Sequence, residues 1–151
     1  MNKDYKIIVA GKGGQGIKLL MTVLAKILSE KFNVSLYYNY DSAIRGGKIF
    51  GFLTFSKEKI GDPLILNGDY LVNLIVEDVK YMGKEEFDLE KFDVFAEAEE
   101  KFKTNKVANM MLLGYILKKI EIEIDKGLLD KVLPEKFKDM NIEAINYGFN
   151  R

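Results

Sequence analysis

The hydrophobic pattern begins with a short apolar run and continues as a helical repeat. Residues 7–10 are all apolar, which is typical of a central parallel strand covered on both faces. After a glycine-rich stretch, apolar residues recur at helical spacing, and polar residues fill the opposite face. The apolar positions are Ile17, Leu20, Met21, Leu24, Ile27 and Leu28. The pattern predicts a strand, a tight turn and an amphipathic helix that begins near Gly16.

Two further strands follow this helix. Apolar and polar residues alternate from 33 to 40, so strand, helix and strand form one right-handed βαβ unit in which both strands run parallel. Residues 48–56 are largely apolar at both alternating positions and predict a strand covered on both sides. The loop before it is too short for a crossover helix, so we expect an antiparallel step with its corner at 45–47.

The middle of the chain is less regular. Residues 70–76 are apolar except for Asn73 and predict a buried strand or a helix–strand junction. Residues 77–90 are charged and carry a break at Gly83. The next stretches predict a short strand at 92–96 and then, from alternating acids and lysines at 97–104, a solvated loop or the entry to a helix.

The last third predicts helices. Residues 105–119 carry a broad apolar face, in which we expect Met110 and Met111 in the core and Gly114 at a close packing contact. Shorter patterns predict a helix at 125–133 and a final helix at 135–148 that ends at a glycine. The whole pattern predicts the α/β class, as a three-layer Rossmann-like domain with a mixed, mainly parallel sheet. We expect residues 1–151 to form this single domain.

The charge of the chain is balanced. Lys+Arg and Asp+Glu both number 23, so the formal net charge is zero. Proteins that bind nucleic acid or an anionic membrane usually carry a basic excess, so the balance argues against both partners. No apolar run approaches the roughly 20 residues that span a bilayer, and the N-terminal residues lack the apolar core of a signal peptide. We therefore expect a cytoplasmic location.

The chain contains no cysteine and no histidine. It has no thiolate for zinc or an iron–sulfur cluster, and it lacks the commonest general base and metal ligand. Chemistry on this chain would need Lys, Asp, Glu, Tyr or Ser, or a separate cofactor. The composition favours a cofactor-handling or scaffolding domain, and we expect neither a metal site nor a catalytic residue on it.

The turn after the first strand is the first candidate site. Gly11, Gly13 and Gly16 match G-x-G-x-x-G, and Gly14 adds a fourth glycine. Glycine adopts positive φ at low cost and lets an anion approach the backbone, while the N-terminus of the following helix favours negative charge. One interpretation is a seat for a phosphate or carboxylate. The alternative is a tight strand-to-helix turn and nothing more. The P-loop pattern is absent.

Charged residues extend the candidate site. Lys12 and Lys18 flank the turn, and Arg45 lies at the predicted corner. The planar guanidinium of an arginine suits bidentate binding of a carboxylate or phosphate. A surface salt bridge is the alternative role of Arg45.

Two glycine motifs and one helix resemble a known family. The chain carries Gly11-Lys-Gly-Gly-Gln-Gly16 and later Ser42-Ala-Ile-Arg-Gly-Gly47, with a strand after it. Asn109, Leu113 and Gly114 fit that family's N-(hydrophobic)-L-G helix. The combination resembles the gamma subunit, or gamma domain, of the 2-oxoacid:ferredoxin oxidoreductases, which include pyruvate, 2-oxoglutarate, branched-chain 2-oxoacid and indolepyruvate enzymes.

The resemblance implies an activity that belongs to a complex. A 2-oxoacid, coenzyme A and oxidised ferredoxin would be converted to an acyl-CoA, carbon dioxide and reduced ferredoxin. Thiamine diphosphate, Mg²⁺ and the iron–sulfur clusters are then expected in partner alpha, beta and ferredoxin-like delta subunits, which agrees with the missing Cys and His. The gamma chain is expected to cover the active-site entrance and to help bind coenzyme A or shape the substrate channel.

The resemblance also implies which residues face a cofactor or substrate. They are Gly11, Gly13, Gly14, Gln15, Gly16, Ser42, Arg45, Gly46 and Gly47. The second motif departs from the family pattern, because family members often have tyrosine, glycine and proline before the R-G-G, whereas this chain has Tyr40-Asp-Ser-Ala-Ile. Its R-G-G form slightly favours the 2-oxoglutarate and indolepyruvate types over the pyruvate type.

Two other functions stay open on the sequence alone. A stand-alone Rossmann-type oxidoreductase that uses NAD would place an acid such as Asp41 after the second strand, to bind the ribose hydroxyls. The early antiparallel step and the small size argue against it. A purely structural interaction subunit would use the glycines only for packing.

Overall fold

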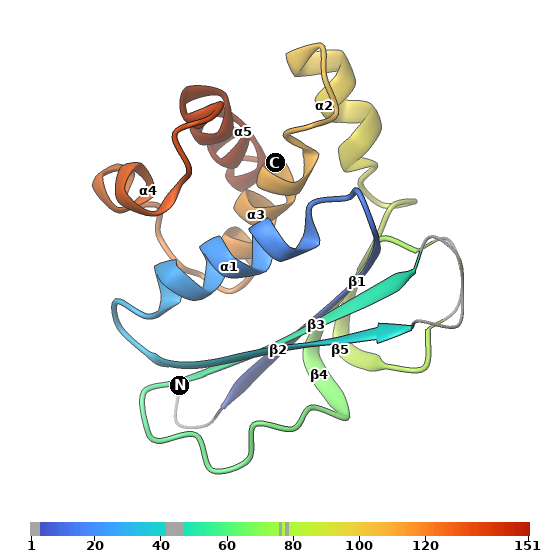
Figure 1. Cartoon of the computed structure of the whole chain (residues 1–151), viewed down its shortest axis with the longest axis vertical. Coiled ribbons are helices and arrows are strands. Elements are labelled where there is room, and N and C mark those ends of the chain that lie inside the picture. The colour runs from blue at the N-terminus through green and yellow to red at the C-terminus, as the bar shows by residue number, and fades with distance from the viewer. Residues whose placement is uncertain (1–3, 42–46, 76, 78) are drawn as a thin grey trace. The chain divides into compact units, whose positions relative to one another are not determined.

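The computed structural model describes residues 4–41, 47–75, 77 and 79–151. The chain divides into two compact units, Met1–Phe92 and Asp93–Arg151. The first unit contains the sheet and one helix, and the second is helical (Figure 1). The expectation of a single domain over residues 1–151 stays a prediction.

The first unit is built on a five-stranded sheet with the order β2-β3-β1-β4-β5. Its elements are β1 (Tyr5–Lys12), α1 (Ile17–Leu28), β2 (Asn33–Asp41), β3 (Lys48–Ser56), β4 (Asn67–Asn73) and β5 (Met82–Asp88). The predicted opening strand, first helix and next two strands are confirmed. The apolar stretch at 70–76 supplies most of β4, which begins earlier and ends at Asn73.

The predicted antiparallel step is also confirmed. β2 pairs antiparallel with β3, and β3 pairs antiparallel with β1. β1 and β2 therefore run parallel, as expected, but β3 lies between them. β1 with β4 and β4 with β5 are parallel pairs. The α/β class and the mixed sheet are confirmed, and the pairs divide evenly between the two directions because the β2–β3 hairpin enters beside β1.

Both faces of the sheet are packed within this unit. On one face, α1 buries Leu20, Met21 and Leu24 completely (Figure 1). Gly51 in β3 permits this close approach, since a Cβ there would lie 3.0 Å from the Met21 Cγ. The opposite face holds a second apolar cluster, formed by Ile8, Ala10, Phe50, Phe52, Ile65, Leu71 and Ile75.

The second unit consists of four helices. They are α2 (Val94–Phe102), α3 (Ala108–Lys119), α4 (Lys126–Val132) and α5 (Lys138–Phe149). α3 is buried along most of its length, and Met110 and Met111 are core residues, as predicted. Gly114 of α3 and Gly148 of α5 allow the two helices to cross closely, because a Cβ on either would collide with the other helix's backbone.

Three sequence predictions were wrong or incomplete. The charged stretch after β4 contains β5, in which Gly83 fits tightly because a Cβ there would lie 2.5 Å from the Leu71 nitrogen. The predicted strand at 92–96 is wrong, and of the two alternatives for 97–104 the helix is the one observed, because both stretches contribute to α2. The Asp93 carboxylate caps this helix by accepting from the Ala96 N–H at 3.1 Å. The last helix continues past its predicted final glycine to Phe149.

Candidate functional site

The glycine turn joins the end of β1 to the start of α1. Gly14 and Gly16 have φ of 86° and 73°, the left-handed region that favours glycine. Gly13 and Gly14 are exposed, and a Cβ added to either would meet no atom of the residues that the structure describes within 4 Å. Space above these two residues is therefore open to an external group.

Other residues of the turn hold its shape. The Gln15 side chain accepts a hydrogen bond from the Lys12 N–H at 2.7 Å, and the Gln15 N–H donates to the Lys12 carbonyl at 3.2 Å. A Cβ on Gly11 would lie 2.5 Å from the Ile17 Cγ1. Gly11 and Gln15 thus serve the packing of the turn, whereas Gly13 and Gly14 leave its outer surface open.

The start of α1 concentrates positive potential beside this open surface. Gly16 is the N-cap residue and has no side chain with which to cap the first-turn N–H groups. The Lys18 ammonium lies 5.0 Å from the centre of the Tyr40 ring. A hydrogen bond with the Tyr40 side chain raises the pKa of Lys18, so this lysine stays cationic near neutral pH. Helix dipole and lysine together favour an anion here.

The second motif meets the glycine turn at the same end of the sheet. The Gly13 N–H donates to the Gly47 carbonyl at 3.3 Å, and Lys12 of β1 pairs with Lys48 of β3. The glycine turn and the residue that ends the second motif are therefore in contact. Ser42, Arg45 and Gly46 lie outside the described residues.

A salt bridge that sequence reasoning missed lies at the same end of the sheet as the glycine turn. The Lys48 ammonium is 2.9 Å from the Glu77 carboxylate, and the lysine side chain is the more buried partner, at 18% exposed against 57%. The hydrogen bond and charge of Lys48 lower the pKa of Glu77, with a smaller contribution from Lys12. Asn73 orders the same loop, because its side chain donates to the Glu77 carbonyl at 3.3 Å. Lys48 begins β3, but Glu77 lies in the loop after β4, so no local sequence pattern joined the two.

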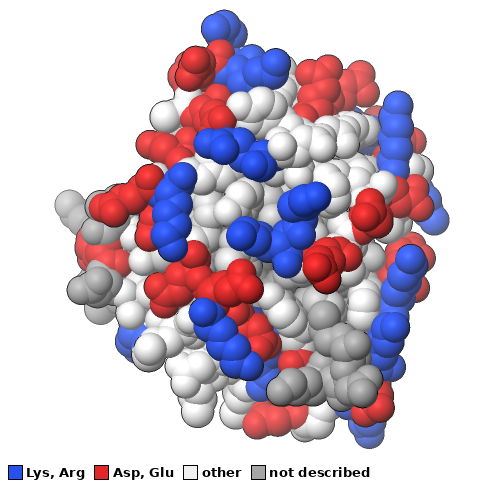
Figure 2. All heavy atoms as spheres, turned by 180° about the vertical axis from the view of Figure 1, so that it is seen from behind, with Lys and Arg blue, Asp and Glu red and all other residues white. Residues whose placement is uncertain are grey.

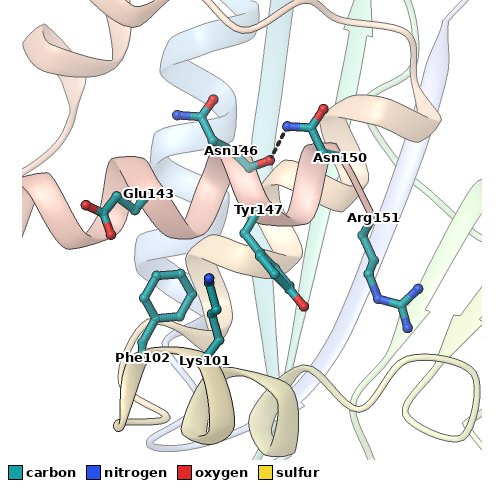
Figure 3. Close-up of a pocket in the computed structure, with 7 residues that line it drawn as sticks. All are labelled: Lys101, Phe102, Glu143, Asn146, Tyr147, Asn150 and Arg151. Atoms are coloured by element: carbon teal, nitrogen blue, oxygen red, sulfur yellow. Dashed lines mark hydrogen bonds between the residues drawn. The ribbon is translucent and has the colours of Figure 1, made fainter.

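The second unit has its own recess, of about 520 Å³. Lys101 and Phe102 of α2 face α5 and the residues that follow it (Figure 3). Its lining residues are Lys101, Phe102, Glu143, Asn146, Tyr147, Asn150 and Arg151. The Tyr147 hydroxyl donates to the Glu97 carboxylate at 2.7 Å, which also accepts from the Arg151 Nε at 3.0 Å.

Two cationic side chains of this recess, Arg151 and Lys101, have partners. The hydrogen bond that the Tyr147 hydroxyl donates to the Glu97 carboxylate raises the pKa of Tyr147, so the neutral phenol is favoured. Lys101 lies 5.9 Å from the centre of the Tyr147 ring. The recess was missed because its α2 residues were assigned to a solvated loop or the entry to a helix, and not to a site. The sequence did contain a signal for a helix here. Asp93 is a suitable N-cap residue, and the apolar Val94 and Ala98 that follow it are spaced four residues apart.

The described residues limit the other site types. Among residues 4–41, 47–75, 77 and 79–151, no three or more Asp or Glu side chains gather where they could hold a metal ion. Within the same ranges, no helix is long and apolar enough to cross a membrane. Figure 2 shows positive and negative side chains interspersed over one face of the molecule, in keeping with the zero net charge.

Comparison with solved structures identifies the fold. The chain is similar to the keto/oxoacid ferredoxin oxidoreductase gamma subunit from Geobacter sulfurreducens PCA, with a TM-score of 0.71 and 20% identity over 97% of this chain and 96% of that one. It is similar to pyruvate oxidoreductase subunit PORC from Thermotoga maritima, with a TM-score of 0.69 and 18% identity over 99% and 97% of the two chains.

A third structure matches only in part of its length. It is the 2-oxoglutarate:ferredoxin oxidoreductase from Magnetococcus marinus, with 2-oxoglutarate, coenzyme A and succinyl-CoA bound. Its TM-score is 0.68 at 20% identity, and the match covers 99% of this chain but 31% of that one. No curated protein sequence matches this chain.

A family model gives the sequence relationship. The model described as pyruvate ferredoxin/flavodoxin oxidoreductase matches residues 6–91, which is more than half of the chain and includes both glycine motifs. The resemblance inferred from those motifs is confirmed by this match and by the gamma-subunit folds. The chain therefore belongs to the pyruvate ferredoxin/flavodoxin oxidoreductase family.

Proposed function

We propose that this chain is the gamma subunit of a multi-subunit 2-oxoacid:ferredoxin oxidoreductase. The complex would convert a 2-oxoacid, coenzyme A and oxidised ferredoxin to an acyl-CoA, carbon dioxide and reduced ferredoxin. The observation that carries the proposal is the family match over residues 6–91, which contains the glycine turn and the corner that meets it at Gly47. The gamma-subunit folds that correspond over nearly the whole chain support it.

Partner chains would carry the redox cofactors. A chain without Cys or His offers no ordinary ligand for an iron–sulfur cluster. Thiamine diphosphate with Mg²⁺ and the clusters would thus be bound by alpha, beta and ferredoxin-like delta subunits, and no residue of this chain is assigned a catalytic role. When bound, thiamine diphosphate supplies the carbanion chemistry, and the clusters accept the electrons.

The proposed role of this chain is to bind an anionic group at the entrance to that active site. The group would be a phosphate of coenzyme A or the carboxylate of the 2-oxoacid. It would approach the exposed backbone of Gly13 and Gly14 and the first turn of α1, where positive potential is concentrated. The guanidinium of Arg45 would supply a bidentate contact to the same group. Ser42 and Gly46, from the same motif, would lie at this site as well.

The observed strand order weighs against an NAD enzyme. Asp41 ends β2, and β3 separates that strand from β1 and the glycine turn. β2, which ends in Asp41, therefore lies two interstrand spacings, or about 9–10 Å, from β1, which leads into the glycine turn. In a dinucleotide-binding site the two strands are neighbours, so that one ligand reaches both the turn and the acid.

Native purification of a tagged chain tests the assignment. The proposal expects larger chains to co-purify with it, together with thiamine diphosphate, iron and sulfide. The preparation should reduce ferredoxin in a reaction that needs both coenzyme A and a 2-oxoacid. Recovery of the chain alone, with NAD binding measured by calorimetry, would instead establish the stand-alone oxidoreductase.

A further inference from the structure

The two edges of the sheet differ in charge. β5 forms one edge and carries three consecutive charged residues, Lys84, Glu85 and Glu86. β2 forms the other edge and is longer, with nine residues against seven. Residues 33–40 of β2 contain no charged side chain. Sheet edges in native proteins are usually protected by charges, proline or shortness, because a bare edge pairs with other strands. β2 has none of these protections.

The side chains of β2 divide cleanly between the two faces of the sheet. Tyr38 and Tyr40 lie on the α1 face, where the Lys18 ammonium is 5.8 Å and 5.0 Å from their ring centres. Tyr37 lies on the opposite face and stacks on Phe52, with ring centroids 4.7 Å apart. The side chains are therefore held by contacts above and below the sheet, and the outer backbone edge of β2 pairs with no other strand of this sheet.

We propose that β2 pairs with β2 of a second copy of this chain, in antiparallel orientation, to form a continuous sheet across a two-fold axis. A two-fold axis perpendicular to the sheet produces antiparallel neighbours and keeps both α1 helices on the same face. Even-numbered residues of β2 then face even-numbered residues of the second copy, and odd-numbered residues face odd-numbered ones. Side chains on the α1 face therefore meet side chains on the α1 face. This inference does not rest on the proposed oxidoreductase function.

Full overlap of the two nine-residue strands fixes the register. It centres the axis on Tyr37, so that Tyr37 faces its own copy. On the α1 face, Leu36 would oppose Tyr38 and Val34 would oppose Tyr40 of the second copy. Aliphatic–aromatic pairs of this kind stabilise antiparallel sheets. The pairing would add about eight main-chain hydrogen bonds, roughly one for each paired residue.

Charge selects a second copy as the occupant. An uncharged strand meets an identical strand without repulsion at any pair from 33 to 40. The β5 edge is less suited to pairing with itself in this way, because full overlap would place Glu85 against Glu85 of the second copy, a like-charge pair on the axis. A different partner strand would have to match the spacing of Val34, Leu36, Tyr38 and Tyr40, which β2 itself matches by symmetry.

Charge substitutions at one predicted pair test both the dimer and its register. Ser35 and Asn39 lie opposite each other across the proposed axis, on the face away from α1. The double variant Ser35→Lys/Asn39→Lys places lysine against lysine at two symmetric pairs. We expect it to raise the dissociation constant of the dimer by about tenfold or more. The charge-swapped variant Ser35→Glu/Asn39→Lys places opposite charges at the same pairs and should restore the wild-type dimer.

The measurement is the molar mass of the full chain by light scattering over a wide concentration range. Glu86→Lys on β5 is the matched control, since it also changes the net charge by two and should leave the dimer unchanged. Circular dichroism spectra that match the wild type, with a cooperative unfolding transition, would establish that every variant is folded. A wild-type chain that stays monomeric overturns the proposal. A double lysine variant that forms the dimer as readily as the wild type also overturns it. Failure of the charge-swapped variant to restore the dimer would do the same.

Discussion

The crossing of α3 and α5 offers the sharpest stability prediction. A Cβ on Gly114 would lie 2.8 Å from the Phe149 nitrogen and closer still to the Ile145 carbonyl oxygen. Both atoms belong to a helix backbone, so no side-chain rotation can relieve the contact. Gly114→Ala must therefore push the two helices apart where α3 is buried.

The size of the effect follows from two opposing terms. An ordinary contact begins at 3.4 Å, and the Ile145 carbonyl oxygen is the closest atom, so the helices must separate by more than the 0.6 Å that would relieve the 2.8 Å contact with the Phe149 nitrogen alone. Overpacking of a well-packed interface costs about 1–3 kcal/mol, and we take about 3 kcal/mol because the backbone is rigid. Alanine recovers about 1 kcal/mol of helix propensity. The expected net loss of unfolding free energy is about 2 kcal/mol, or roughly 4–8 °C in melting temperature.

Thermal and urea unfolding, followed by circular dichroism, would measure this loss. Gly127→Ala in α4 is the matched control, because its Cβ would meet only the Asp125 side chain, at 3.3 Å. That variant should change the free energy of unfolding by less than about 1 kcal/mol. If Gly114→Ala proved as stable as the wild type, the close crossing of α3 and α5 would be refuted.

Three further predictions concern single side chains. Asp93→Ala removes the α2 cap and should lower the free energy of unfolding by about 1 kcal/mol in urea titrations. Burial, with smaller effects of nearby acids, raises the pKa of Tyr5 to about 12, so the neutral phenol is favoured in the folded state. Wild-type stability should fall between about pH 10 and 12, and Tyr5→Phe should fall less over the same range in parallel urea titrations. Lys48→Gln should raise the pKa of Glu77 toward its ordinary value, measured by NMR titration of the carboxylate.

Elements with a strong hydrophobic period were predictable, and those stabilised by partners were not. The first strand and helix were predicted because their apolar residues repeat with a fixed spacing. β5 lacks such a signal, since Phe87 is its one fully buried side chain, and its place depends on pairing with β4. α2 was misassigned because its mixed charges hide two buried residues, Val94 and Ala98, behind a capping aspartate.

The candidate site was predictable where one stretch of chain forms it. The glycine turn follows from local sequence, and its meeting with the corner at Gly47 followed from the antiparallel step. The Lys48–Glu77 salt bridge joins the start of β3 to the loop after β4, so it depends on strand order. That order places β3 beside β1, an arrangement that spacing along the chain alone did not reveal.

The most direct test of the account is steady-state kinetics of the purified complex carrying Gly13→Ala. A Cβ at this position meets no atom of the described part of the chain, so we expect folding to be unaffected, but it fills the space proposed for the anion. Gly61→Ala is the matched control, because its Cβ is equally unhindered and lies outside the glycine turn. The account predicts a KM for coenzyme A or for the 2-oxoacid raised about tenfold, and a similar rise in Arg45→Ala. Kinetic constants equal to those of Gly61→Ala in both variants would contradict it.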